Sequence, residues 1–202
     1  CGFDDRIRMS EFKSLCVFCG SRVGGEPAYQ EVAKKLGQEI SGRNLNLIYG
    51  AGDIGLMSIV ARASLECGGN VTGIIPKFIQ AFEVGSPGEI ELIVVESMHE
   101  RKQMMYERSD GFIALPGGLG TLDETIEMIT WKQLQQHKKP IVLVNVNNYW
   151  NPFIDLIQAV VDCGFGHGGI NQLFTVVDDV YKVFEALENA PEPGIEVLTS
   201  HL

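Results

Sequence analysis

The feature that most constrains this chain is a glycine-rich turn at residues 116–120, Pro-Gly-Gly-Leu-Gly, between two regular segments. The apolar run Phe112–Leu115 precedes the turn, and helical spacing follows it from Thr121 to Gln133. This order predicts a buried strand, a tight turn and a helix whose first backbone N–H groups are free to bind an anion. The glycines let the backbone approach such an anion closely, and Thr121 can add a hydroxyl group or cap the helix.

Glu124 lies three residues after Thr121, so a carboxylate stands next to the predicted anion site. Because a carboxylate repels phosphate, we expect Glu124 to act on a different part of the ligand. The same spacing is typical of a capping box, in which Thr121 is the N-cap and the Glu124 side chain bonds back to the backbone. The sequence alone leaves both interpretations open.

Apolar runs alternate with helical patterns along the chain, and this alternation predicts a parallel sheet covered by helices on both faces. The expected strands are the short apolar runs at 15–19, 45–49, 71–75, 90–95, 112–115, 141–146 and 174–177. The expected helices cover 27–42, 56–66, 98–109, 121–133, 153–163 and 179–187. The runs at 90–95 and 141–146 predict buried strands, whereas residues 77–89 lack a clear period and predict an irregular lid or loop.

Glycine turns follow three of the expected strands, at Gly20-Ser21, Gly50–Gly55 and Gly117–Gly120. Ligands of parallel sheets bind beyond the carboxyl ends of the strands, at the point where the strand order reverses. We therefore expect the three turns to converge on one crevice. Three ordinary tight turns that never meet would have the same sequence pattern.

Composition limits the possible functions. A length of 202 residues predicts one domain over 1–202, with flexible tails at 1–12 and 190–202. The net charge of −10 argues against a nucleic-acid-binding surface, and no apolar run is long enough to cross a membrane. The five scattered cysteines fit a reducing cytoplasm, and Cys16-x-x-Cys19 lies within a strand pattern without a second pair of zinc ligands.

A cationic segment, Met98-His99-Glu100-Arg101-Lys102, begins the helix that precedes the Phe112–Leu115 strand. Cations in a first helical turn are unfavourable against the helix dipole, so we expect an anion or a carboxylate such as Glu100 or Glu124 nearby. Arg101 shares a helix face with Met105, which predicts that its side chain lies against the body of the protein. The alternative is a solvated charged face in which only methionine is buried.

Taken together, the two stretches resemble the signatures of the LONELY GUY family, the cytokinin riboside 5′-monophosphate phosphoribohydrolases, whose members are often labelled lysine decarboxylase-like. The family patterns M-H-x-R-K and P-G-G-x-G-T-x-x-E correspond here to 98–102 and 116–124. The resemblance includes 16–21, 49–57 and 129–131, and so covers most of the chain from residue 15 to about residue 164. Ala51 and Ser58 stand where the family commonly has glycine.

The resemblance implies a Rossmann-like α/β fold with a parallel sheet of about six or seven strands, usually as a homodimer with its sites near the interface. It also implies hydrolysis of the N-glycosidic bond of a nucleoside 5′-monophosphate, AMP or an N6-prenylated AMP, without a metal or other cofactor. Arg101 and Glu124 match the family's catalytic pair. From the matched motifs and the glycine turns, the expected substrate-binding residues are Gly20, Ser21, Gly52, Glu83, Met98, Lys102, Gly117, Gly118, Gly120, Thr121 and Asp123.

Three other functions remain open. A non-catalytic carrier of a nucleotide or pterin cofactor on the same fold would need no Arg101–Glu124 pair and would release no adenine from AMP. A pyridoxal-phosphate decarboxylase, which the older family label suggests, needs a lysine Schiff base. A nicotinamide dehydrogenase would use the spacing Gly50-x-Gly52-x-x-Gly55, which the family motif also explains. For Trp131 and Trp150 we expect roles in packing or at an interface.

Overall fold

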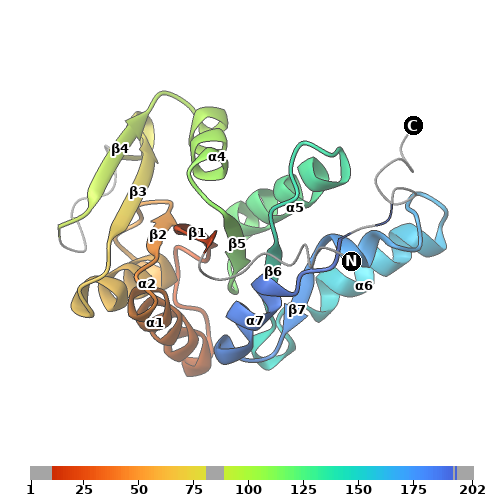
Figure 1. Ribbon diagram of the computed structural model, residues 1–202, viewed down its shortest axis with the longest axis horizontal. Helices are drawn as coiled ribbons and strands as arrows, with labels where there is room; N and C mark the ends of the chain where they lie inside the picture. The colour runs from red at the N-terminus through yellow and green to blue at the C-terminus, as the bar shows by residue number, and fades with distance from the viewer. Residues whose placement is uncertain (1–10, 81–88, 193, 195–202) are drawn as a thin grey trace, which may run out of the picture.

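The computed structural model describes residues 11–80, 89–192 and 194, which form the expected α/β architecture around one parallel sheet (Figure 1). The sheet has seven strands in the order β4-β3-β2-β1-β5-β6-β7, and every neighbouring pair is parallel. Its strands are β1 (Ser14–Phe18), β2 (Asn46–Tyr49), β3 (Val71–Pro76), β4 (Glu91–Val95), β5 (Gly111–Ala114), β6 (Ile141–Val144) and β7 (Thr175–Val177).

Helices connect the strands, as the alternation in the sequence predicts. The α-helices are α1 (Pro27–Gly42), α2 (Gly55–Glu66), α3 (Lys77–Gln80), α4 (Met98–Glu107), α5 (Leu119–Gln133), α6 (Asn151–Asp162) and α7 (Val183–Glu188). Short 3-10 helices are η2 (Val146–Asn148), η3 (Ile170–Leu173) and η4 (Val180–Lys182). None of the helices in the described ranges combines the length and the apolar character needed to cross a bilayer.

Two apolar layers, one on each face of the sheet, form the core. α1, α2 and α7 pack on one face, and α4, α5 and α6 pack on the other. Figure 1 shows α1 and α2 below the strands and α4 and α5 above them. The side chains of β1 alternate between the layers, with Leu15 and Val17 in the first and Cys16 and Phe18 in the second. This burial on both faces explains why the central strands are apolar at every position.

The alternation also separates the two cysteines of the Cys16-x-x-Cys19 pattern. Cys19 belongs to the layer with α1 and α2, whereas Cys16 belongs to the opposite layer. Both are free thiols, and burial raises the pKa of each well above its ordinary value, so they stay protonated. Within the described part of the chain, no group of three or more His, Cys, Asp or Glu is placed to hold a metal ion.

Two segments differ from the sequence-based prediction. The run 90–95 was expected to be a buried strand, which is wrong, because β4 lies at the edge of the sheet and exposes Leu92 and Val94. Residues 77–80, expected to be irregular, form the short helix α3, and residues 81–88 lie outside the described residues. Phe12, at the end of the expected N-terminal tail, is buried in the first apolar layer.

Candidate active site

The site lies where the strand order reverses, between β1 and β5. β1 continues through α1 to β2 on one side, whereas β5 continues through α5 to β6 on the other. From the two strands the chain runs to opposite sides of the sheet. Ligands of parallel sheets bind beyond the carboxyl ends of the strands at such a reversal. Gly20 N–H donates to the Pro116 carbonyl at 3.0 Å, so the two loops touch each other at this point.

The third glycine turn, after β2, reaches the same place, and the predicted convergence is confirmed. Leu56 N–H donates to the Gly20 carbonyl at 3.0 Å, and Arg101 Nη2 donates to the Gly50 carbonyl at 3.1 Å. A Cβ atom on Gly50 would lie 1.8 Å from Arg101 Nη2, so the guanidinium can rest against this backbone only because residue 50 is glycine. Ala51 adopts the left-handed conformation, with φ at 57°, which explains why glycine is common at this position.

The start of α5 supplies a set of free backbone donors. The helix begins at Leu119 after the N-cap Gly118. The N–H groups of residues 118–121 donate to no acceptor among the described residues, and the first intrahelical bond runs from Leu122 N–H to the Gly118 carbonyl at 3.1 Å. Because these donors lie at the positive end of the helix dipole, they are able to bind an anion, as the sequence predicts.

The start of α5 also decides between the two interpretations of Glu124. Since Gly118 is the N-cap, Thr121 is the third residue of the helix and Glu124 the sixth, so the capping box is wrong. Thr121 is buried, and its hydroxyl packs so closely on Gly117 that a Cβ atom there would lie 2.1 Å from it.

Arg101 of α4 and Glu124 of α5 form a buried pair. Arg101 Nη2 lies 3.8 Å from Glu124 Oε1, and each side chain is 10% exposed. Arg101 Nη1 lies 3.8 Å from Met98 Sδ, while its buried Nε has no hydrogen-bond partner in the described part of the chain. The prediction that Arg101 lies against the body of the protein is confirmed, and the solvated charged face is wrong.

The environment of Glu124 changes its acidity. Burial raises the pKa of its carboxyl from 4.5 to about 7, against the opposing positive charge of Arg101, which lowers it. A group with a pKa near neutral pH can take up and release a proton under physiological conditions. Glu124 therefore has the acidity expected of a general base.

Lys102, whose side chain is buried, forms a second charged cluster beside this pair. Its Nζ lies 3.0 Å from Asp123 Oδ2 and 2.9 Å from Glu127 Oε2. Burial opposes the charge on Lys102, but the bonds to Glu127 and Asp123 outweigh it and raise the pKa of the amine. Glu127 was not identified from the sequence, although its spacing of one turn from Asp123 was a usable signal.

Four predicted residues line one pocket of about 630 Å³: Gly20, Ser21, Gly117 and Gly118. Arg101 and Glu124 are not among its lining residues, so the pocket adjoins the start of α5 and not the Arg101–Glu124 pair. Sequence reasoning missed Arg22 and Tyr149 in this lining. Arg22 directly follows Gly20-Ser21 at the end of β1, which was a usable signal, whereas nothing in the local sequence connects Tyr149 with the 116–120 turn.

The other predicted residues are more dispersed. Gly52 packs against Met57, whose Cε atom would lie 2.3 Å from a Cβ atom at position 52. Gly120 faces open space, and the side chain of Asp123 is 59% exposed. Glu83 lies outside the described residues. Trp150 is fully buried, as expected for a packing residue.

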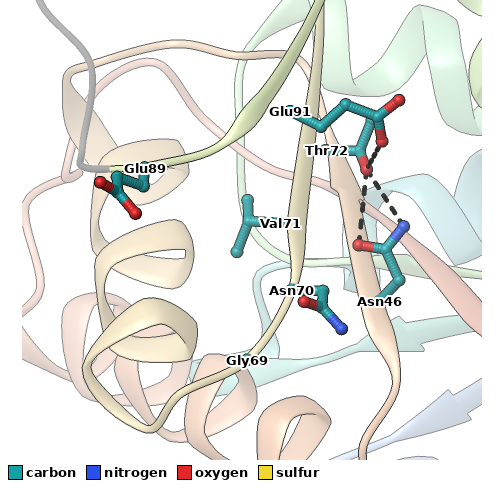
Figure 2. Close-up of a pocket in the computed structure, with 7 residues that line it drawn as sticks. All are labelled: Asn46, Gly69, Asn70, Val71, Thr72, Glu89 and Glu91. Atoms are coloured by element: carbon teal, nitrogen blue, oxygen red, sulfur yellow. Dashed lines mark hydrogen bonds between the residues drawn. The ribbon is translucent and has the colours of Figure 1, made fainter.

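A second pocket, of about 400 Å³, lies at the opposite end of the sheet. Figure 2 shows Asn46, Thr72 and Glu91, which come from the amino ends of β2, β3 and β4 and are linked by hydrogen bonds. Glu89 also lines this pocket. Two carboxylates would repel a phosphate group, and ligands of parallel sheets bind at the other end, so we do not assign this pocket to the candidate site.

Comparisons with known proteins agree with this geometry. A family model described as "Possible lysine decarboxylase" matches residues 57–187. Cytokinin riboside 5′-monophosphate phosphoribohydrolase LOG7 of Arabidopsis thaliana is 42% identical over 193 residues, which cover 96% of this chain and 88% of that protein. LOG1 of the same plant is 46% identical over 156 residues, which cover 77% and 73%. Among solved structures, the molybdenum cofactor carrier protein of Chlamydomonas reinhardtii shares the fold, with a TM-score of 0.66 at 20% identity over 88% of this chain and 97% of that one.

Proposed function

The chain belongs to the family of cytokinin riboside 5′-monophosphate phosphoribohydrolases, and from this we propose that it hydrolyses the N-glycosidic bond of a nucleoside 5′-monophosphate. The substrate is AMP or an N6-substituted AMP such as isopentenyl-AMP, and the products are the free base and ribose 5-phosphate. The observation that carries the proposal is the buried Arg101–Glu124 pair, 3.8 Å apart, next to the free N–H groups of α5.

The phosphate group occupies the start of α5. Gly118, Gly120 and Thr121 offer backbone N–H groups there, and Arg22 is the cationic side chain in the lining of the adjoining pocket. Lys102 is already paired with two carboxylates and Arg101 with one, so their positive charges are largely offset. Arg22 and the helix dipole therefore supply the attraction that a phosphate dianion needs.

The ribose then lies toward Glu124. Breaking the bond between C1′ of the ribose and the base nitrogen builds positive charge on the sugar, as in glycoside hydrolysis. The Glu124 carboxylate stabilises this charge and takes a proton from the water that attacks C1′. The electron pair of the broken C–N bond leaves with the base, which is then protonated by solvent. Water is thus added across the bond, and no oxidant or reductant is needed.

Arg101 fixes the carboxylate and contacts the substrate. Its Nη2 is already held by the Gly50 carbonyl and lies near Glu124, while its buried Nε is left to bind a phosphate or ribose oxygen. The planar guanidinium suits this role, because it presents several donors in fixed directions. By the family motifs, Met98, Lys102 and Asp123 complete the nucleotide contacts, and the same resemblance assigns Glu83 to the substrate-binding residues.

We place the protein in the cytoplasm as a homodimer built from single-domain subunits. Exposed apolar side chains support self-association, and they include Ile126 on α5, Leu134 directly after α5, and Leu156 on α6. Phe153 is the one buried residue of α6. Buried free thiols are consistent with a reducing compartment. Light scattering tests the dimer, since a monomeric mass at micromolar concentration contradicts it.

Chromatography of the bases released from AMP and isopentenyl-AMP tests the activity. We expect free base and ribose 5-phosphate in equal amounts from at least one of the two nucleotides. The ratio of the two rates then shows which base is preferred. Intact nucleotide that binds but is not cleaved would instead indicate a carrier on the same fold.

A further inference from the structure

Tyr149 makes a contact that the reaction above does not use. Its phenol O–H donates a hydrogen bond to the carbonyl oxygen of Gly117, 32 residues earlier in the chain. Tyr149 follows η2 beyond the carboxyl end of β6, and it lines the same pocket as Gly117 and Gly118. A side chain from the loop that follows the neighbouring strand β6 thus holds one peptide group of the 116–120 turn.

The loop that carries Tyr149 is held independently of the turn. Asn147 and Asn148 both have left-handed backbone conformations, with φ at 49° and 60°, which asparagine tolerates better than most residues. Trp150 N–H donates to Asn145 Oδ1 at 2.7 Å, which closes the loop. The ring of Tyr149 meets the ring of Tyr29 edge to face, with centroids 6.0 Å apart. The phenol is therefore placed before any ligand arrives.

The geometry of a peptide group links this contact to the anion site. In the described residues every peptide bond is trans, so the C=O of Gly117 and the N–H of Gly118 point in opposite directions. Because Tyr149 holds the carbonyl oxygen, the N–H of Gly118 is directed away from the tyrosine oxygen. Rotation of this peptide would replace a donor with a carbonyl oxygen, and glycines on both sides resist such a rotation little.

We infer that Tyr149 is a positioning residue that keeps the Gly117–Gly118 peptide oriented so that Gly118 N–H faces the substrate phosphate. This inference rests on the proposed function, in which the phosphate occupies the start of α5. Phosphate is bound equally in the ground state and in the transition state of glycosidic cleavage. Loss of the positioning bond therefore weakens binding without slowing the chemical step.

The test compares Tyr149→Phe with Tyr106→Phe. Tyr106 is the matched control, because its phenol also donates to a backbone carbonyl, that of Gln136 at 3.2 Å. This bond lies at the carboxyl ends of α4 and α5, whereas the anion site is at the start of α5. For Tyr149→Phe we expect KM for the nucleotide to rise about 3- to 10-fold with kcat unchanged. The calorimetric Kd of ribose 5-phosphate, and the inhibition constant of inorganic phosphate, should rise by the same factor.

For Tyr106→Phe we expect a small fall in Tm and no change in KM or in either phosphate constant. Unchanged binding of ribose 5-phosphate to Tyr149→Phe would overturn the inference, as would a loss of kcat at constant KM. The calorimetric measurement needs no turnover. If the wild type released no base, but Tyr149→Phe weakened its binding of ribose 5-phosphate, the proposed hydrolysis would be contradicted and the positioning role of Tyr149 would stand.

Discussion

Arg101 Nη2 lies 3.8 Å from Glu124 Oε1, and the two side chains remain only 10% exposed although they come from different helices. Removing two charges from water is unfavourable, and a buried ion pair seldom stabilises a fold more than apolar residues of similar volume would. The retained pair therefore points to chemistry. Its position beside the start of α5 places that chemistry within reach of a bound sugar phosphate.

Replacing Glu124 with glutamine should abolish base release while nucleotide binding persists. The amide keeps the size of the side chain but can neither accept a proton from water nor carry negative charge, so kcat should fall about 10²- to 10⁴-fold. Chromatography of the released base and calorimetry with AMP measure the two effects. Glu31→Gln, on the exposed face of α1, is the control and should keep wild-type values. Near-normal turnover by Glu124→Gln would refute the assignment.

The pH dependence of kcat/KM should report the same carboxyl. Burial raises the pKa of Glu124 to about 7, so we expect kcat/KM to fall about tenfold per pH unit below that value. The charge of Arg101 lowers this pKa, so Arg101→Met should move the acid limb of the residual activity to higher pH. If the acid limb of the pH profile stays in place or moves to lower pH in Arg101→Met, the charge of Arg101 does not lower the pKa of Glu124.

The stability of the protein should depend on pH through Glu124 in a direction opposite to that of most carboxylates. Between pH 4.5 and about 7 the folded protein keeps a proton that the unfolded chain has released. The contribution of the neutral side chain is thus complete below pH 4.5 and is lost as the pH rises through about 7.

The free energy of unfolding of the wild type, minus that of Glu124→Gln, should therefore decrease by about 3 kcal/mol over this range. Urea unfolding at a series of pH values measures the difference. A constant or rising difference would mean that Glu124 is ionised in the folded protein at acidic pH.

Much of the fold follows from the sequence because a parallel sheet is buried on both faces. Every expected strand lies within two residues of an observed one, and α1 begins and ends where its apolar period predicts. The convergence of three glycine turns was also predictable, since all parallel strands point their carboxyl ends to one edge. Edge strands are the exception, because the apolar pattern of β4 does not say whether anything covers it.

The site was only partly predictable, for reasons of tertiary structure. The family motifs identified Arg101 and Glu124 as a catalytic pair. Local spacing alone could not tell whether Glu124 serves the site or forms a capping box with Thr121. Arg22 could have been found from its place directly after Gly20-Ser21, whereas Tyr149 reaches the pocket through a loop whose meeting with the 116–120 turn depends on strand order. No local pattern encodes a bond between a phenol after β6 and a carbonyl after β5.

Replacing Gly50 with alanine should impair activity while the fold is retained. The added Cβ would lie 1.8 Å from Arg101 Nη2, which is the flexible end of a side chain and not backbone, so the guanidinium moves and the path of the chain does not. The displaced guanidinium then loses the Gly50 carbonyl and its place near Glu124, and misplacement of a catalytic group by about 1 Å can reduce the rate about 10²-fold. Gly42→Ala, at the end of α1, is the matched control, because its Cβ meets open space.

Activity assays and thermal melts of Gly50→Ala and Gly42→Ala compare the two positions. Equal kcat/KM for Gly50→Ala and Gly42→Ala would show that the place of Arg101 against this backbone does not matter for turnover.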